Sequence, residues 1–224
     1  MKSTRDGAAK APPAGLGAAG DEIRQTLLLP LLLERFDPEQ PLTVLDAGFG
    51  VPETVTFFSG FRCRLHFAGL YDNAALDALS ADADADDEAS AEERLETACA
   101  RMLAVKPQTR FDICLLWDFL NYLPVPALQA FSNVLRAHLH RDTMGHGFGA
   151  FKANAPAMSG AAPERALQYG VLDEQRLMVR PRPEFSAPPY SHSRATLAAS
   201  FNCFEIARGT LLREGTMELL LRAR

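Results

Sequence analysis

The stretch from Leu42 to Glu53, with the sequence LTVLDAGFGVPE, constrains the fold more than any other part of the chain. It begins as a short apolar run typical of a buried strand, reaches Asp46 at the end of that run, and turns through Gly48 and Gly50. Glycines let a backbone turn tightly and approach a ligand closely, and the N-terminus of a following helix directs its N–H groups at that ligand. The pattern therefore predicts a strand–turn–helix corner with a ligand beside it.

A second predicted strand runs from Leu65 to Tyr71 and is followed directly by Asp72. In a nucleoside-binding βαβ unit, a carboxylate after the second strand accepts hydrogen bonds from ribose hydroxyls, and we expect this role for Asp72. The alternative for Asp72 is an N-cap of the next helix. Asp46 has a similar alternative, since it can cap the glycine turn through the backbone amides instead of binding a ligand.

The Asp-x-Gly-x-Gly order of Asp46, Gly48 and Gly50 resembles motif I of class I S-adenosylmethionine-dependent methyltransferases. The fingerprint of NAD-binding enzymes instead expects a third glycine where this chain has Glu53. A glycine that is common in the methyltransferase pattern is replaced here by Pro52. The resemblance implies S-adenosylmethionine (SAM) as the cofactor, bound by Asp46, Gly48, Gly50 and Asp72, with Asp46 near its methionine end.

The order of the predicted elements extends the resemblance over residues 21–224. We expect an α/β fold with a Rossmann-like, doubly wound and mainly parallel sheet that ends in an antiparallel hairpin, as in class I methyltransferases. Strands are predicted at 42–46, 65–71, 111–117, 147–152, 201–208 and 217–222. Helices are predicted at 21–36, 53–61, 73–79, 91–105, 126–139 and 194–200. Residues 153–190 are rich in Pro and Ala and are predicted to be irregular, apart from a short strand at 175–179.

One interval departs from the family. Class I methyltransferases have a third strand, whose last residue holds the adenine amino group, between the positions of Asp72 and Phe111. This interval contains no β-patterned run, and its acidic segment Ser80–Ser90 is predicted to be a solvated loop. Residues 1–20 are rich in Ala, Gly and Pro and are predicted to be a disordered tail before a single domain at 21–224.

The loop after the predicted strand at 111–117 carries the candidates for chemistry. The resemblance implies that Trp117 lies in the cofactor site and that Asp118 and Tyr122 face the transferred methyl group. Asp118 is a general base if burial raises its pKa, and a solvated loop acid otherwise. His192, in a Pro-rich segment, is a second candidate base for a hydroxyl acceptor, with an ordinary surface histidine as the alternative.

Composition limits the partners. The net charge of −5 and the pI near 5.6, without a cluster of Lys and Arg, argue against a nucleic-acid partner. The four cysteines form no Cys-x-x-Cys pair, and His138 and His140 fall on different faces of a helix, so no metal site is expected. The apolar run at 27–33 is too short to span a membrane. We therefore expect a soluble, cytoplasmic protein with a small-molecule substrate; the sequence does not indicate its oligomeric state.

Three functions are compatible with these patterns. The first is a SAM-dependent methyltransferase that acts on a small molecule. The second is a catalytically silent methyltransferase-like module that regulates or assembles with a partner, which Pro52, the missing strand and the acidic segment favour. The third is a Rossmann oxidoreductase, which Asp46 and Glu53 disfavour.

Overall fold

The computed structural model describes residues 20–83, 88–149, 166–212 and 216–224. Its main sheet has six strands in the order β3-β2-β4-β5-β9-β8, of which the first four are parallel and β9 is antiparallel to both its neighbours. The strands are, in this order, Cys63–Phe67, Leu42–Asp46, Phe111–Trp117, Leu139–Gly149, Met217–Ala223 and Phe204–Leu211. The prediction of a mainly parallel sheet that ends in an antiparallel hairpin is confirmed.

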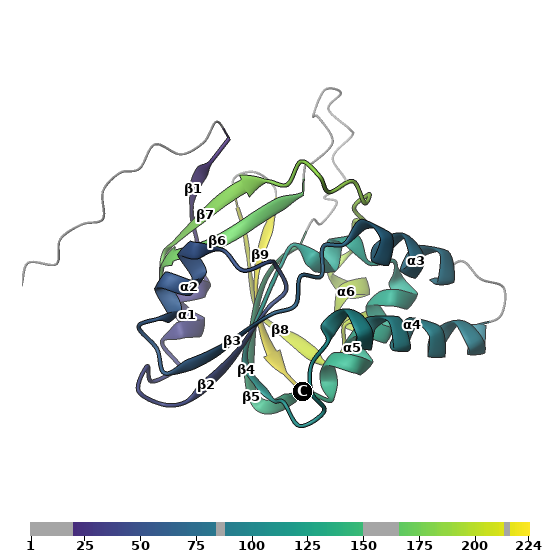
Figure 1. The fold of residues 1–224 in the computed structure, drawn as a ribbon, viewed down its shortest axis with the longest axis horizontal. Helices are drawn as coiled ribbons and strands as arrows, with labels where there is room; N and C mark the ends of the chain where they lie inside the picture. Colours follow the sequence, from purple (N-terminus) through teal and green to yellow (C-terminus); the bar gives the residue numbers. More distant parts are fainter. Residues whose placement is uncertain (1–19, 84–87, 150–165, 213–215) are drawn as a thin grey trace, which may run out of the picture.

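Helices cover both faces of this sheet (Figure 1). On one face lie α1 (Leu29–Leu33) and α2 (Pro52–Phe58). On the other face lie α3 (Asn73–Ala83), α4 (Glu88–Leu103), α5 (Val125–Arg136) and α6 (Arg194–Ser200), and a 3₁₀ turn, η1 (Phe119–Tyr122), follows β4. The doubly wound α/β class is therefore confirmed, and the carboxyl ends of β2 and β4 lie side by side, where such folds bind ligands.

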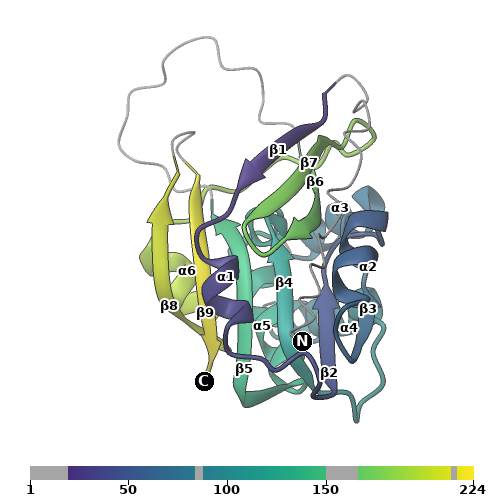
Figure 2. The same cartoon turned by 90° about the vertical axis from the view of Figure 1, so that its left-hand side faces the viewer.

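A second, three-stranded antiparallel sheet lies across the carboxyl ends of the main strands (Figure 2). We call it the small sheet; its strands are, in order, β1 (Glu22–Gln25), β7 (Arg176–Pro181) and β6 (Leu167–Asp173). The short strand predicted at 175–179 is confirmed as part of β7. The irregular structure predicted around it is wrong for β6, which is a strand because it pairs with β7.

The predicted helix at 21–36 is wrong over most of its length. Residues 22–25 form β1 because they pair with β7, and only Leu29–Leu33 is helical. Pro30 does not kink a longer helix; it lies in the first turn of α1, where a missing N–H costs nothing.

Between Asp72 and Phe111 the described residues, 72–83 and 88–110, contain no strand. The predicted loop at Ser80–Ser90 is wrong at both ends, since α3 continues to Ala83 and α4 begins at Glu88. Alanine has the highest helix propensity, and the segment has Ala81 and Ala83 at the end of α3 and Ala89 at the start of α4. The predicted tail lies outside the described residues, apart from Gly20.

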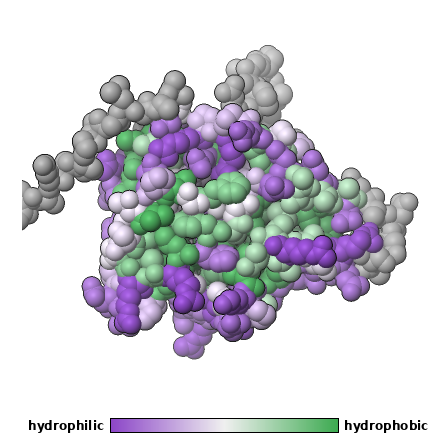
Figure 3. Space-filling view, viewed as in Figure 1, coloured by the Kyte–Doolittle hydropathy of each residue, from purple (hydrophilic) through white to green (hydrophobic). Residues whose placement is uncertain are grey.

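Buried strands supply most of the core. Ile113, Cys114 and Leu115 of β4 are fully buried, as a strand covered by helices on both faces requires. Figure 3 shows apolar residues across the middle of one face of the molecule and hydrophilic residues around its border. Among the described helices, none is long and apolar enough to cross a membrane.

Candidate functional site

Asp46 is the last residue of β2, and only 1% of the residue is exposed. One carboxylate oxygen, Oδ1, accepts hydrogen bonds from the Gly48 backbone N–H and the Trp117 indole N–H, both at 2.7 Å. The other oxygen, Oδ2, is buried and has no hydrogen-bond partner. Burial raises the pKa of Asp46 to about 7 even though both hydrogen bonds lower it. The Asp46 carboxylate, with a pKa near neutral, therefore lies between β2 and β4, where the chain order of the parallel strands reverses.

Trp117, the last residue of β4, donates its indole N–H to Asp46, and the small sheet covers its ring. Its indole ring stacks on Tyr169 of β6, with ring centroids 5.2 Å apart and planes 7° from parallel. Its backbone φ is +50°, which is a strained conformation for a bulky residue. On the neighbouring strand, a Cβ atom at Gly147 would lie 2.9 Å from the Trp117 carbonyl oxygen, so only glycine fits there. Strain and close packing concentrate at the end of β4.

The glycine turn packs against the chain's own side chains. A Cβ atom at Gly48 would lie 3.1 Å from Asp46 Oδ1, and one at Gly50 would lie 3.3 Å from the Phe67 ring. The small sheet lies directly on the start of α2, since a Cβ atom at Gly170 of β6 would lie 3.1 Å from the Val51 side chain. The turn is formed as the sequence predicts, and the small sheet covers it.

Asp118 follows β4 and forms a second buried acid, with 7% of the residue exposed. Its Oδ1 accepts a 2.6 Å hydrogen bond from the Tyr71 hydroxyl, and its Oδ2 lies 3.4 Å from the Tyr122 hydroxyl. The Leu167 amide of β6 also bonds to this carboxylate. Burial raises the pKa of Asp118 to about 6, against the Tyr71 hydrogen bond and the charge of Arg182. The structure thus brings Asp118 and Tyr122 together and adds Tyr71.

Arg182, just after β7, contributes the positive charge of the site. Its guanidinium carbon lies 3.9 Å from the centre of the Tyr71 ring and 5.7 Å from that of Phe49. Its N–H groups donate long hydrogen bonds, of 3.3 and 3.4 Å, to the Leu167 carbonyl oxygen. The charge of Arg182 lowers the pKa of both buried acids, Asp46 and Asp118. The sequence prediction missed Tyr71 and Arg182, because neither belongs to a motif.

Two predicted site residues have other contacts. Asp72 is exposed, and its Oδ1 accepts a 2.8 Å hydrogen bond from the Ala75 N–H at the start of α3. His192 is 7% exposed, and its Nε2 lies 2.9 Å from the Leu123 carbonyl oxygen, which requires Nε2 to be the donor. Among the hydrogen bonds of the described residues, none joins His192 to Asp118. The structure therefore gives Asp72 a capping contact and His192 a backbone contact beside η1.

A third buried acid lies on the far side of Trp117. Glu218 of β9 accepts hydrogen bonds from the backbone amides of Leu27 and Leu28, at 2.9 and 3.0 Å, and from the Thr26 hydroxyl. His146 Nε2 lies 2.8 Å from its Oε1, and the His146 ring packs edge-on against Trp117. Burial acts to raise the pKa of Glu218, but His146 and the donors around it lower that pKa to about 2.

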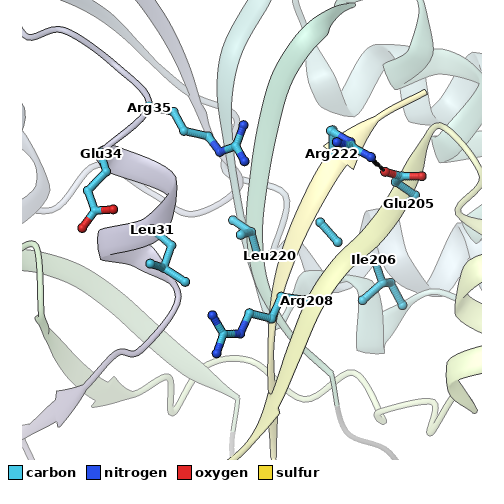
Figure 4. A pocket seen from close by; sticks show the side chains of 9 residues that line it. Leu31, Glu34, Arg35, Glu205, Ile206, Arg208, Leu220 and Arg222 are labelled. Carbon is cyan, nitrogen blue, oxygen red and sulfur yellow. Dashed lines mark hydrogen bonds and ion pairs between the residues drawn. The ribbon is translucent and has the colours of Figure 1, made fainter.

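A groove of about 730 Å³ lies between α1 and the β8–β9 hairpin (Figure 4). Figure 4 shows Arg35 and Arg208 pointing across it and Glu34 pointing away. Its remaining charged residues, Arg222 and Glu205, form an ion pair with each other. The groove has exposed charges and no buried acid, so the site at the ends of β2 and β4 is the better candidate for chemistry.

The main sheet has what the resemblance to class I methyltransferases implies at three points. These are the Asp46 turn after the first main strand, the parallel order around it, and the antiparallel β9 within a C-terminal hairpin. The third strand of the family is missing from the described residues. Three features of the sheet therefore agree with the resemblance, and the missing strand departs from it.

Comparison with known proteins adds general likenesses. No protein-family model and no curated protein matches the sequence significantly. Solved structures that resemble the chain include the pyocyanin biosynthetic protein PhzM, at 14% identity and a TM-score of 0.44, covering 88% of this chain and 55% of PhzM. Another is the Burkholderia thailandensis 1,6-didemethyltoxoflavin-N1-methyltransferase, at 15% identity and a TM-score of 0.43, covering 82% of this chain and 72% of that enzyme.

A third is the glycopeptide N-methyltransferase MtfA complexed with SAM, at 13% identity and a TM-score of 0.44, covering 88% of this chain and 92% of MtfA. The chain spans only about half the length of PhzM. At such identities and TM-scores the likeness is general, and no activity of those proteins follows for this chain.

Proposed function

We propose that this chain is a SAM-dependent methyltransferase that acts on a small-molecule acceptor. The observation that carries the proposal is Asp46, a buried carboxylate with one oxygen held by Gly48 and Trp117 and the other without a partner. Leaving a buried carboxylate oxygen unbonded destabilises a fold, so such a group is retained where it has a task. Its position at the end of the first main strand is the one that motif I of the family occupies.

The residues fit the charged amino-acid end of SAM. The free Oδ2 of Asp46 is an acceptor for an ammonium group, and Trp117 fixes the orientation of the carboxylate through Oδ1. Asp72 is the proposed partner of the ribose hydroxyls, since only its Oδ1 caps α3 and its carboxylate is exposed. Arg182 and Tyr71 pack together at the ends of the same strands, so cofactor entry displaces Arg182 in this proposal.

The chain's own residues have simple tasks in the reaction. When bound, SAM supplies a methyl group on a sulfonium, and the thioether leaves without being protonated. Asp118 is the proposed base that takes the proton lost by the acceptor, with Tyr71 and Tyr122 holding its two oxygens. A pKa of about 6 leaves Asp118 mostly ionised at neutral pH. The small sheet excludes water from the site through Tyr169, which covers Trp117.

Titration calorimetry with S-adenosylhomocysteine tests the proposal. We expect the wild-type protein to bind this product, and Asp46→Asn to bind it at least about ten-fold more weakly because the ammonium loses its charged partner. Glu205→Gln is the matched control, since Glu205 is a partly exposed acid on the far hairpin and should leave affinity unchanged. Absence of binding in the wild type contradicts the proposal.

A silent methyltransferase-like module is the second candidate. It is favoured by the contact of Arg182 with Tyr71, by the capping bond of Asp72, and by the missing strand among the described residues. The same titration separates the candidates, because a silent module gives no heat with S-adenosylhomocysteine. Binding of a nicotinamide nucleotide instead would support the oxidoreductase alternative.

A further inference from the structure

The Arg182 guanidinium packs against side chains from other parts of the chain. We call Tyr71, Phe49 and Asp118 together the cation seat. The guanidinium lies over the face of Tyr71, which follows β3, and within 5.7 Å of the centre of the Phe49 ring, which belongs to the glycine turn. Both cation–π contacts in the described part of the chain are made by this one side chain. Aromatic faces attract cations through their negative quadrupoles, and the attraction is stronger where the contact is partly shielded from water.

A buried carboxylate completes the seat. Asp118 accepts the Tyr71 hydroxyl hydrogen bond at 2.6 Å, so its negative charge lies at the edge of the ring that the guanidinium covers. Tyr71 and Asp118 are 4% and 7% exposed, whereas Arg182 is half-buried and Phe49 is 50% exposed. The cation seat is therefore buried at the Asp118 carboxylate and exposed to solvent at Phe49.

The half-buried Arg182 guanidinium makes only long hydrogen bonds. Among the described residues, its hydrogen bonds go only to the Leu167 carbonyl oxygen and are 3.3 and 3.4 Å long. The neighbouring Arg180, on β7, instead makes short contacts of 2.6 and 3.1 Å with the carboxylates of Glu53 and Asp21. Arg180 anchors the small sheet, whereas Arg182 fills an aromatic seat without a direct ion pair among the described residues.

We infer that Tyr71, Phe49 and Asp118 form a binding site for an organic cation, an alkylammonium, guanidinium or sulfonium group, which Arg182 fills from within the chain until a ligand displaces it. The inference rests on the proposed function for its biological ligand, which is either an amine acceptor or the sulfonium of SAM. An alkylammonium acceptor that binds there first gives a proton to Asp118, and the nitrogen lone pair freed in this way then takes the methyl group from the sulfonium, which leaves as the neutral thioether. The binding site itself is testable without a cofactor.

The test empties the seat and refills it with a small probe. Arg182→Ala is titrated at pH 8 with methylguanidinium and, separately, with its neutral counterpart N-methylurea. Trp117 is the sole tryptophan of the chain and stacks on Tyr169 of the small sheet, so its fluorescence reports the binding. We expect methylguanidinium to bind with a dissociation constant of roughly 1–10 mM and ethylammonium to bind similarly, as expected for one cation–π contact beside a carboxylate. N-methylurea should bind at least about ten-fold more weakly, since it carries no charge.

Three controls isolate the seat. Arg180→Ala removes a guanidinium from the same strand but leaves the seat filled, so it should not bind methylguanidinium. Arg182→Lys keeps a cation in place and should exclude the probe, while Arg182→Ala combined with Asp118→Asn should lose binding. If Arg182→Ala does not fold, as judged by circular dichroism and thermal melting, Arg182→Gln is titrated in the same way.

Two outcomes overturn the inference. Binding of N-methylurea as tightly as methylguanidinium means that the seat recognises shape and not charge, and absence of probe binding means that there is no cation site. Comparing SAM with S-adenosylhomocysteine on Arg182→Ala then separates the two ligand sources. A preference for the charged SAM assigns the seat to the sulfonium, and equal affinity assigns it to the acceptor. Because the probe titration contains no cofactor, its failure is distinct from a failure of the proposed function.

Discussion

Glu218 and Asp46 are both buried carboxylates of the main sheet, with 0% and 1% of the residue exposed, yet their surroundings are opposite. Glu218 is surrounded by donors: two backbone amides, the Thr26 hydroxyl and His146. Asp46 has two donors on one oxygen and none on the other. The pKa of Glu218 is lowered to about 2, while burial raises the pKa of Asp46 to about 7. The same functional group is stabilised in one place and destabilised in the other.

The difference separates a structural acid from a candidate functional one. Glu218 fastens the segment between β1 and α1 to β9, so its bonds hold the small sheet's first strand to the main sheet. The hydrogen bond between Asp46 and Trp117 links only β2 and β4, and these strands already pair through their backbones. The Oδ1 of Asp46 caps the glycine turn through the Gly48 amide, but its unbonded Oδ2 stabilises nothing in the fold, so this oxygen beside strained Trp117 marks the place where a ligand is expected.

Replacing Glu218 should produce the largest effect. Glu218→Gln turns one acceptor oxygen into an N–H₂ donor that faces other donors, and we expect a loss of about 3–5 kcal/mol in the free energy of unfolding. Because the folded-state pKa is lowered from 4.5 to about 2, the wild-type contribution is present above pH 4.5 and lost as the pH falls to 2. Urea denaturation followed by Trp117 fluorescence measures both effects. The control is Glu205→Gln, which breaks the partly exposed ion pair between Glu205 on the adjacent strand and Arg222. It should lower the free energy of unfolding by less than about 1 kcal/mol.

Asp46→Asn should act in the opposite direction. The folded-state pKa of about 7 lies above the ordinary 3.8, so the wild-type protein loses stability as the pH rises from 3.8 to 7. Asparagine keeps the acceptor for Gly48 and Trp117 and carries no charge. We expect it to stabilise the fold by about 2–4 kcal/mol at pH 8 and to have no effect near pH 4. Destabilisation at pH 8 would show that Asp46 is a structural acid like Glu218.

Asp118→Asn should repeat that pattern on a smaller scale. Its pKa is raised only to about 6, and its Oδ1 keeps the Tyr71 hydrogen bond in the variant. We expect stabilisation of about 1–2 kcal/mol at pH 8, lost as the pH falls to 3.8, because the wild-type penalty develops between pH 3.8 and 6. Urea denaturation at a series of pH values measures the difference. A difference that does not change with pH would mean that Asp118 keeps its ordinary pKa.

The site was predictable where it depends on local sequence. Asp46, Gly48 and Gly50 lie within five residues, and a strand followed by a turn and a helix can be recognised from such a run. The order of the main-sheet strands and of the helices from α2 onward followed for the same reason. The position of Asp118 after a nearly continuous apolar strand was likewise readable from the pattern.

The small sheet and the cation seat were not predictable in this way. β1 is a strand only because residues near 178 pair with it, and its mostly exposed residues give no apolar alternation. Tyr71 and Asp118 are 47 positions apart, and Arg182 lies in a Pro-rich segment without periodicity. Contacts of this kind are set by how the sheets pack, which single-sequence patterns do not record.

Replacing Asp72 should have the smallest effect on stability. The replacement also separates its two proposed roles, helix cap and ribose ligand. Its Oδ1 caps α3 through Ala75, so Asp72→Ala should cost about 1 kcal/mol. Asp72→Asn keeps a capping oxygen and removes the charge, so its free energy of unfolding should equal that of the wild type. If Asp72 also binds the ribose, both variants should bind S-adenosylhomocysteine roughly ten-fold more weakly, because a charge-assisted hydrogen bond is lost. Calorimetry on Asp72→Asn is decisive: unchanged affinity with unchanged stability would leave Asp72 as a helix cap only, the structural counterpart of Glu218 at the surface.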